Sequence, residues 1–207
     1  MYHHLYSTDK DVRKAVFSYT EAYLVYGSVL VDLERIEEAQ AVLRKGLKWN
    51  PVSFSLNSEY IETFKMLGRI DEFYELSKKA IKLAYRPKNL ARCYRNLGYY
   101  FVEKERYSEA LGCYRFSNVY DKDAKQSQSE MYYILGMTDG KVKEHSIEEF
   151  KNYSKLYDFP LGVDNDIMGL SLCYGEDFLK KGHKEAAKYL YQIAYDMVND
   201  EKLKKHS

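Results

Sequence analysis

Histidine and cysteine are the residues of this sequence that could hold a metal ion or supply a nucleophile. The five histidines are scattered over the termini and the expected turns, with no i, i+4 pair and no HExxH helix. Cys93, Cys113 and Cys173 are far apart and form no CxxC pair. Because zinc and thiol sites need their ligands at short, defined spacings, we expect no metal site. We interpret the three cysteines as small core residues in a reducing, cytoplasmic protein.

Motifs for phosphate binding and for nucleophilic catalysis are also missing. The sequence contains no GxxxxGK[ST], GxGxxG or GxSxG, the patterns that cradle a phosphate or expose a catalytic serine. Carboxylates mostly stand beside lysine or arginine, as in residues 103–106 and 200–205, which is typical of solvated helix faces. We therefore expect no enzymatic activity and no cofactor.

The composition narrows the class of partner and of fold. Lys and Arg number 32 against 31 Asp and Glu, so there is no basic excess to neutralise a nucleic-acid backbone. No stretch approaches the ~18 apolar residues of a membrane span, and the N-terminus lacks the apolar run of a signal peptide. Three prolines and eleven glycines in 207 residues favour long helices joined by short connections. The expected partner is a protein or peptide, not a nucleic acid or a membrane.

The sequence repeats with a period of 34 residues. Three glycines, each preceded by a large or apolar residue, are followed twelve residues later by alanine and sixteen residues later by a large side chain. Small residues at two fixed positions let two antiparallel helices approach closely. The three sets are Gly27, Ala39 and Leu43; Gly98, Ala110 and Tyr114; and Gly175, Ala187 and Tyr191.

This pattern resembles the tetratricopeptide repeat, most clearly in residues 91–124. The resemblance implies an all-α fold, an α/α superhelix in which antiparallel helix pairs stack as a right-handed solenoid. It implies one domain over residues 1–207, with roughly ten to eleven helices. The expected parts are a helical extension over 8–19, capped by Ser7 or Thr8, and repeats at 20–53, 54–87, 91–124, 129–164 (irregular) and 168–201.

The second and fourth copies depart from this pattern. Phe73 and Phe150 stand where alanine is usual, and the fourth copy aligns only with about two extra residues between its helices, near Gly140. We expect both phenylalanines to splay their helix pairs slightly. Around this copy, Ser146 and Glu149 have the spacing of a capping box, and residues 157–165 are the strongest loop signal.

The resemblance also implies a concave groove lined by the first helix of each repeat. The third copy is richest there, because Arg92, Arg95 and Tyr99 share one helical face. Arginine and tyrosine are frequent binding hot spots, which predicts an acidic or C-terminal peptide as ligand. In the alternative, glutamates that include Glu130 neutralise a solvated face. The tentative groove residues are Arg92, Arg95, Asn96, Tyr99, Tyr133, Glu59 and Glu62.

Two functions remain open at this stage. The first is a scaffold that binds an extended or helical peptide of a partner in its groove. The alternative is a peptide-sensing regulatory module from a longer bacterial regulator, which requires a longer parent chain. Binding of chaperone C-termini is not implied, because at the family's carboxylate-binding positions only Arg92 matches, while Leu24, Ser28 and Glu59 do not.

Overall fold

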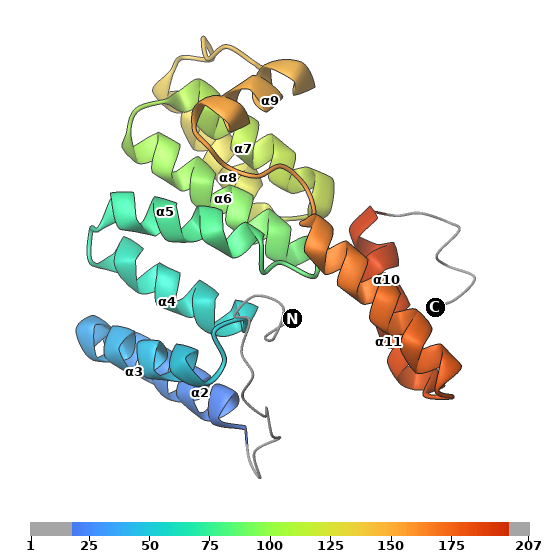
Figure 1. Cartoon of the computed structure of the whole chain (residues 1–207). Helices are drawn as coiled ribbons and strands as arrows, with labels where there is room; N and C mark the ends of the chain where they lie inside the picture. The colour runs from blue at the N-terminus through green and yellow to red at the C-terminus, as the bar shows by residue number, and fades with distance from the viewer. Residues whose placement is uncertain (1–17, 199–207) are drawn as a thin grey trace. The chain divides into compact units, whose positions relative to one another are not determined.

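The computed structural model describes residues 18–198, and this part of the chain is all-α. It contains ten helices and no strand (Figure 1), which confirms the expected fold class. The helices are α2 Tyr19–Asp32, α3 Ile36–Trp49, α4 Phe54–Met66, α5 Ile70–Ile81, α6 Pro87–Glu103, α7 Tyr107–Tyr120, α8 Lys125–Met137, α9 Ile147–Leu156, α10 Asn165–Lys180 and α11 Lys184–Val198.

The chain forms two compact units, Met1–Leu83 and Ala84–Ser207. The first unit contains α2–α5 and the second contains α6–α11. Four consecutive pairs, α2 with α3, α4 with α5, α6 with α7 and α10 with α11, pack together across short turns. The two helices of each pair are therefore antiparallel. One solenoid through residues 1–207, with a right-handed path, stays a prediction.

The same backbone turn ends the first helix of every repeat. Five residues there have φ between 50° and 81°, the left-handed conformation that commonly ends a helix. The next residue's N–H then reaches back into the last helical turn; Arg106, for example, donates to the Phe101 carbonyl at 2.8 Å. The turn residues are Glu34, Gly68, Glu105, Asp139 and Gly182.

The fourth repeat begins earlier than the sequence analysis placed it. Helix α8 starts at Lys125 instead of residue 129, and its turn residue Asp139 follows Glu105 by one full period of 34 residues. In this register Tyr132, not Gly136, occupies the eighth position, where the first, third and fifth repeats carry glycine. A Cβ atom at Gly136 would meet nothing within 4 Å, so this glycine lies at no helix crossing.

Close helix crossings form where the repeat pattern predicted them. A Cβ atom at Gly27 would lie 2.5 Å from Leu43 Cδ2, and one at Gly98 would lie 2.9 Å from Tyr114 Cε2. Neither site has room for a methyl group, so glycine is what lets these helices approach. The paired alanines are buried as expected: Ala39, Ala110 and Ala187.

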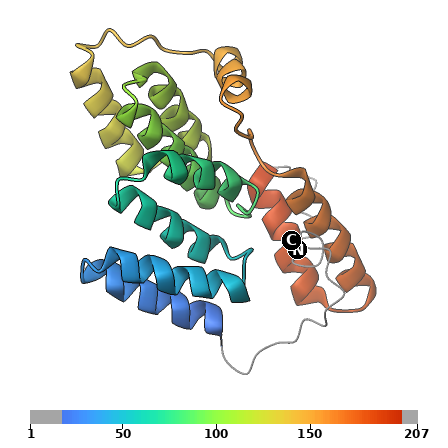
Figure 2. The same cartoon turned by 60° about the vertical axis from the view of Figure 1, so that its left-hand side comes forward.

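The second helix of the fourth repeat packs in an unexpected place. Residues 138–146 separate α8 from α9 (Figure 2), where the other pairs have three-residue turns. Helix α9 packs on α7 instead: the Phe150 and Phe116 rings are 5.0 Å apart, and Phe150 Cδ2 would lie 2.8 Å from a Cβ at Gly112. The expectation that Phe150 stands at a crossing with the first helix of its own repeat is therefore wrong, and the insertion is longer than two residues.

A helix cap and a loop, both predicted from local sequence, are confirmed around α9. The Ser146 hydroxyl accepts from the Glu149 N–H at 3.2 Å and the Glu149 carboxylate accepts from the Ser146 N–H at 2.9 Å, a complete capping box. The predicted loop lies between Leu156, the end of α9, and Asn165, the start of α10. In physical terms, both signals are local and need no knowledge of packing.

The start of the first repeat differs from the prediction. Helix α2 begins at Tyr19 with Ser18 as its N-cap, whose hydroxyl accepts from the Glu21 N–H. The helix that carries Gly27 is therefore not continuous with a segment capped by Ser7 or Thr8. The expected extension over residues 8–19 otherwise lies outside the described residues.

Burial separates the cysteines and the tyrosines into two groups. Cys93 and Cys113 are buried, and burial raises the pKa of the Cys93 thiol to about 12. Cys173 is exposed on α10, so the expectation that all three cysteines are core residues is wrong. Its neighbour Tyr174 is exposed as well. Helix α10 packs mainly on α11, whereas the preceding helix α9 packs on α7. Tyr94, Tyr114 and Tyr191 are, by contrast, buried in the core.

Candidate functional site

The third-repeat face predicted from the sequence lies on α6. Proline at N1 starts this helix, where its missing N–H costs nothing, and the buried stripe with Tyr94 and Leu97 fixes its rotation. Arg92, Arg95 and Tyr99 are then half-buried on another side of the helix. The structure thus leaves part of each side chain accessible to a ligand.

Arg95 is held by an acidic residue that the sequence analysis did not single out. Its Nη1 lies 3.1 Å from Oδ2 of Asp121, the C-cap residue of α7, and the two side chains are 16% and 18% exposed. The pair joins the middle of α6 to the C-terminal end of α7. Arg95 is therefore positioned by the fold, and part of its charge is compensated within the repeat.

The buried Tyr114 links α6, α7 and α8. Burial raises its pKa, and the carboxylate of Glu130 on α8 and the hydroxyl of Tyr99 on α6 add to this effect. Glu130 therefore faces Tyr114 on α7. Tyr133, on the same helix α8, is 51% exposed. Tyr133 occupies the ninth position of its repeat, as Tyr99 does in the repeat before it.

The seven predicted groove residues fall in two units. Glu59 and Glu62 lie on α4 in the first unit, where Glu62 Oε1 is 3.3 Å from Lys65 Nζ. The other five lie in the second unit: Arg92, Arg95, Asn96, Tyr99 and Tyr133. A groove that joins both groups stays a prediction, whereas the five residues of the second unit lie on α6 and α8, which both pack on α7.

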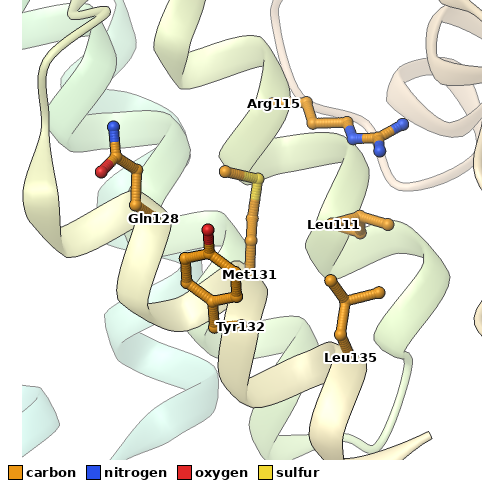
Figure 3. Close-up of a pocket in the computed structure, with 6 residues that line it drawn as sticks. All are labelled: Leu111, Arg115, Gln128, Met131, Tyr132 and Leu135. Carbon is orange, nitrogen blue, oxygen red and sulfur yellow. The ribbon is translucent and has the colours of Figure 1, made fainter. Parts of the chain in front are cut away.

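A cleft between α7 and α8 was missed by the sequence analysis. It has a volume of about 290 Å³ and mostly apolar walls (Figure 3). Figure 3 shows Leu135 of α8 beside Leu111 of α7, with Met131 between Leu111 and the ring of Tyr132. A register in which Asp139 follows Glu105 by 34 residues places Tyr132 at the eighth position of the fourth repeat. This register, readable from the sequence, was the signal that could have predicted the cleft. Six residues line this α7–α8 cleft: Leu111, Arg115, Gln128, Met131, Tyr132 and Leu135.

A second cleft, of about 390 Å³, lies between α4 and α5 in the first unit. Its aromatic wall includes Phe64, over whose ring the Arg69 guanidinium sits at 4.5 Å. Arg69 also pairs with Glu72 at the rim. The acidic side chains here are partly neutralised by their own neighbours, so the cleft has no strong charge preference.

Within residues 18–198, no group of three or more histidine, cysteine, aspartate or glutamate side chains is arranged to hold a metal ion. None of the helices described for this chain combines the length and the apolar character needed to cross a bilayer.

Comparisons with known proteins agree with this geometry. The family model described as Tetratricopeptide repeat matches residues 20–53, the span of the first repeat. The PilF structure from Pseudomonas aeruginosa is 18% identical with a TM-score of 0.51, covering 85% of this chain and 75% of that one.

A second solved structure is similar to the same extent. It is the TPR2AB domain of yeast Sti1 in complex with pHSP90, 11% identical with a TM-score of 0.51, covering 87% of this chain and 64% of that one. No curated protein matches the sequence. At these identities the likeness concerns the fold alone. Residues 20–53 match the tetratricopeptide-repeat model, and the described part of the chain has the all-α helical-repeat fold of the similar solved structures.

Proposed function

We propose that this chain is a non-catalytic scaffold that binds an extended or helical peptide of a partner protein on the first-helix face of its second unit. The binding residues are Arg92, Asn96 and Tyr99 on α6 and Tyr133 on α8. Arg95 forms the floor of this face, positioned by Asp121.

The ion pair between Arg95 and Asp121 is the observation that carries this proposal. At 3.1 Å and with both side chains mostly buried, it orders one guanidinium before any ligand arrives. Ordering a side chain in advance lowers the entropic cost of binding. Tyr99 and Tyr133 add two aromatic groups at the same position of successive repeats, a spacing that suits a peptide lying across both helices.

The comparisons support a peptide ligand at the level of the fold. The similar Sti1 domain was solved in complex with pHSP90. The positions expected to hold a chaperone carboxylate carry Leu24 and Ser28 in this chain, which favours a different peptide. A cluster with arginine, asparagine and tyrosine prefers acidic or aromatic groups.

Partner capture with variant proteins tests the proposal. The intact chain is immobilised and incubated with lysate of its source organism, and bound proteins are identified by mass spectrometry. We expect the double variant Tyr99→Ala, Tyr133→Ala to capture at least tenfold less of the partner than the wild type does. The matched control is Tyr26→Ala, which removes another exposed tyrosine in the first unit. Equal capture by the wild type and the double variant would contradict the proposal.

A further inference from the structure

The α7–α8 cleft occupies the place where a second helix packs in the other repeats. Counted from Lys125, Tyr132 and Leu135 stand at positions eight and eleven of the fourth repeat. The same two positions are Gly27 and Leu30 in the first repeat and Gly98 and Phe101 in the third, and all four are buried. Tyr132 is 75% exposed and Leu135 is 37% exposed. Helix α8 therefore presents a second-helix contact surface that α9 does not cover.

The chain's own repeats show what kind of helix fits such a surface. In three repeats the glycine at position eight meets a large residue sixteen positions later, as Gly98 meets Tyr114. The second repeat reverses the sizes, because Ile61 stands at position eight and the fully buried Ser77 stands sixteen residues later. Tyr132 is also large, so its partner helix should carry a small residue there. Helix α5 has this form, with Phe73 one turn before Ser77.

We propose that the α7–α8 cleft binds an amphipathic helix of a partner protein, with a large apolar residue followed four positions later by a small one. The helix takes the place of a second repeat helix, antiparallel to α8, and its large side chain fills the cleft. Leu111 forms the floor. Arg115, held by Glu144 at 2.5 Å and 2.8 Å, forms one wall.

The chain's own α9 is a poorer occupant than a partner helix. It is already packed, with Phe150 5% exposed and with Tyr157 hydrogen-bonded to Glu109 of α7 at 3.1 Å. Moving α9 to α8 would expose these groups. A helix supplied by another protein completes the fourth repeat without breaking any of these contacts.

A labelled peptide with the sequence of residues 69–83, which contains the Phe73 to Ser77 spacing, is the probe. It is titrated with the intact chain and binding is followed by fluorescence anisotropy. We expect saturable binding that weakens at least tenfold in Leu135→Asp, since a carboxylate in an apolar cleft is costly. The control Leu179→Asp, at a leucine of α10 that is 44% exposed and lies outside the cleft, should bind as the wild type does.

Each other outcome overturns the proposal. Absence of saturable binding to the wild type would show that the cleft accepts no helix of this kind. Equal effects of the two aspartate variants would place the peptide elsewhere. Light scattering of the same proteins tests whether a second copy of the chain fills the cleft. A wild-type dimer that Leu135→Asp converts to a monomer would show that the occupant is the chain itself and not a partner protein. Because Tyr99 and Tyr133 are unchanged in Leu135→Asp, this test is independent of the proposed first-helix binding face.

Discussion

The hydroxyl of Tyr94 accepts a hydrogen bond from the N–H of Gly162 at 2.7 Å and donates one to the carbonyl of Pro160 at 3.1 Å. Tyr94 is fully buried in the third repeat, whereas residues 157–164 form the loop between α9 and α10. One signature tyrosine of the repeat therefore fixes a loop far away in the sequence. Burial raises the pKa of Tyr94, so its hydroxyl stays protonated and can donate.

We predict that Tyr94→Phe destabilises the second unit by about 1–3 kcal/mol, because the Gly162 N–H and the Pro160 carbonyl lose their partner in a part-buried place. Thermal or urea unfolding of the purified chain measures this. Tyr133→Phe removes a hydroxyl from a half-exposed tyrosine and should stay within about 0.5 kcal/mol of wild type. Equal stabilities of the two variants would show that the loop is not held by Tyr94.

Two glycine substitutions test the repeat register. Gly27→Ala places a methyl group 2.5 Å from Leu43 Cδ2, an overpacking that costs about 1–3 kcal/mol. Gly136→Ala meets nothing within 4 Å and should stabilise α8 by about 0.5–1 kcal/mol, because alanine is the better helix former. Urea unfolding should rank Gly136→Ala above wild type and Gly27→Ala below it. A destabilised Gly136→Ala would argue against a fourth repeat that begins at residue 125.

The cap of α9 should depend on pH. Hydrogen bonds from Lys143 and Ser146 lower the pKa of Glu149 from 4.5 to about 2. Since the folded pKa lies below the unfolded one, this contribution to stability is present above about pH 4.5 and is lost as the pH falls toward 2. The protection factors of the α9 amides, which compare the observed exchange with the intrinsic exchange at the same pH, should therefore fall as the pH is lowered through this window. In Glu149→Gln, which cannot ionise, protection of the α9 amides should lose the part of its pH dependence that Glu149 supplies; an unchanged profile would exclude Glu149 as the source.

Arg95→Ala should lower stability as well as binding. The substitution leaves Asp121 mostly buried without its partner, which costs about 1–2 kcal/mol. Lys180→Ala breaks a pair whose side chains are 72% and 63% exposed and should shift the melting temperature much less. Equal shifts in the two variants would mean that the Arg95 pair contributes little to the fold.

Local sequence signals predicted most of the helices and their crossings. Gly27, Gly98 and Gly175 identified the closest approaches because a glycine opposite a large residue is a property of one helix pair. Ser146 with Glu149 predicted a cap for the same reason, since both partners lie within one turn. Such features depend on residues that are close in the chain, and a single sequence contains them.

Features that depend on distant packing were not predictable in this way. Leu135-Gly136 resembled the signature pair and shifted the fourth repeat by four residues, although the turn spacing favours residue 125. Phe150 could not reveal that its helix packs on α7, because the matching Gly112 belongs to another repeat. Asp121 was missed for a similar reason: its role depends on where the end of α7 meets Arg95.

Site-specific photo-cross-linking at Tyr133 tests the central claim most directly, namely that the first-helix face of the second unit binds a partner protein. A benzophenone amino acid replaces Tyr133 in the intact chain, and a second protein carries it at the exposed Lys180 as a control. After irradiation in lysate of the source organism, we predict one dominant adduct at position 133 that the added Tyr99→Ala substitution reduces at least tenfold. Adducts of equal yield at both positions, or an adduct that Tyr99→Ala leaves unchanged, would contradict the account.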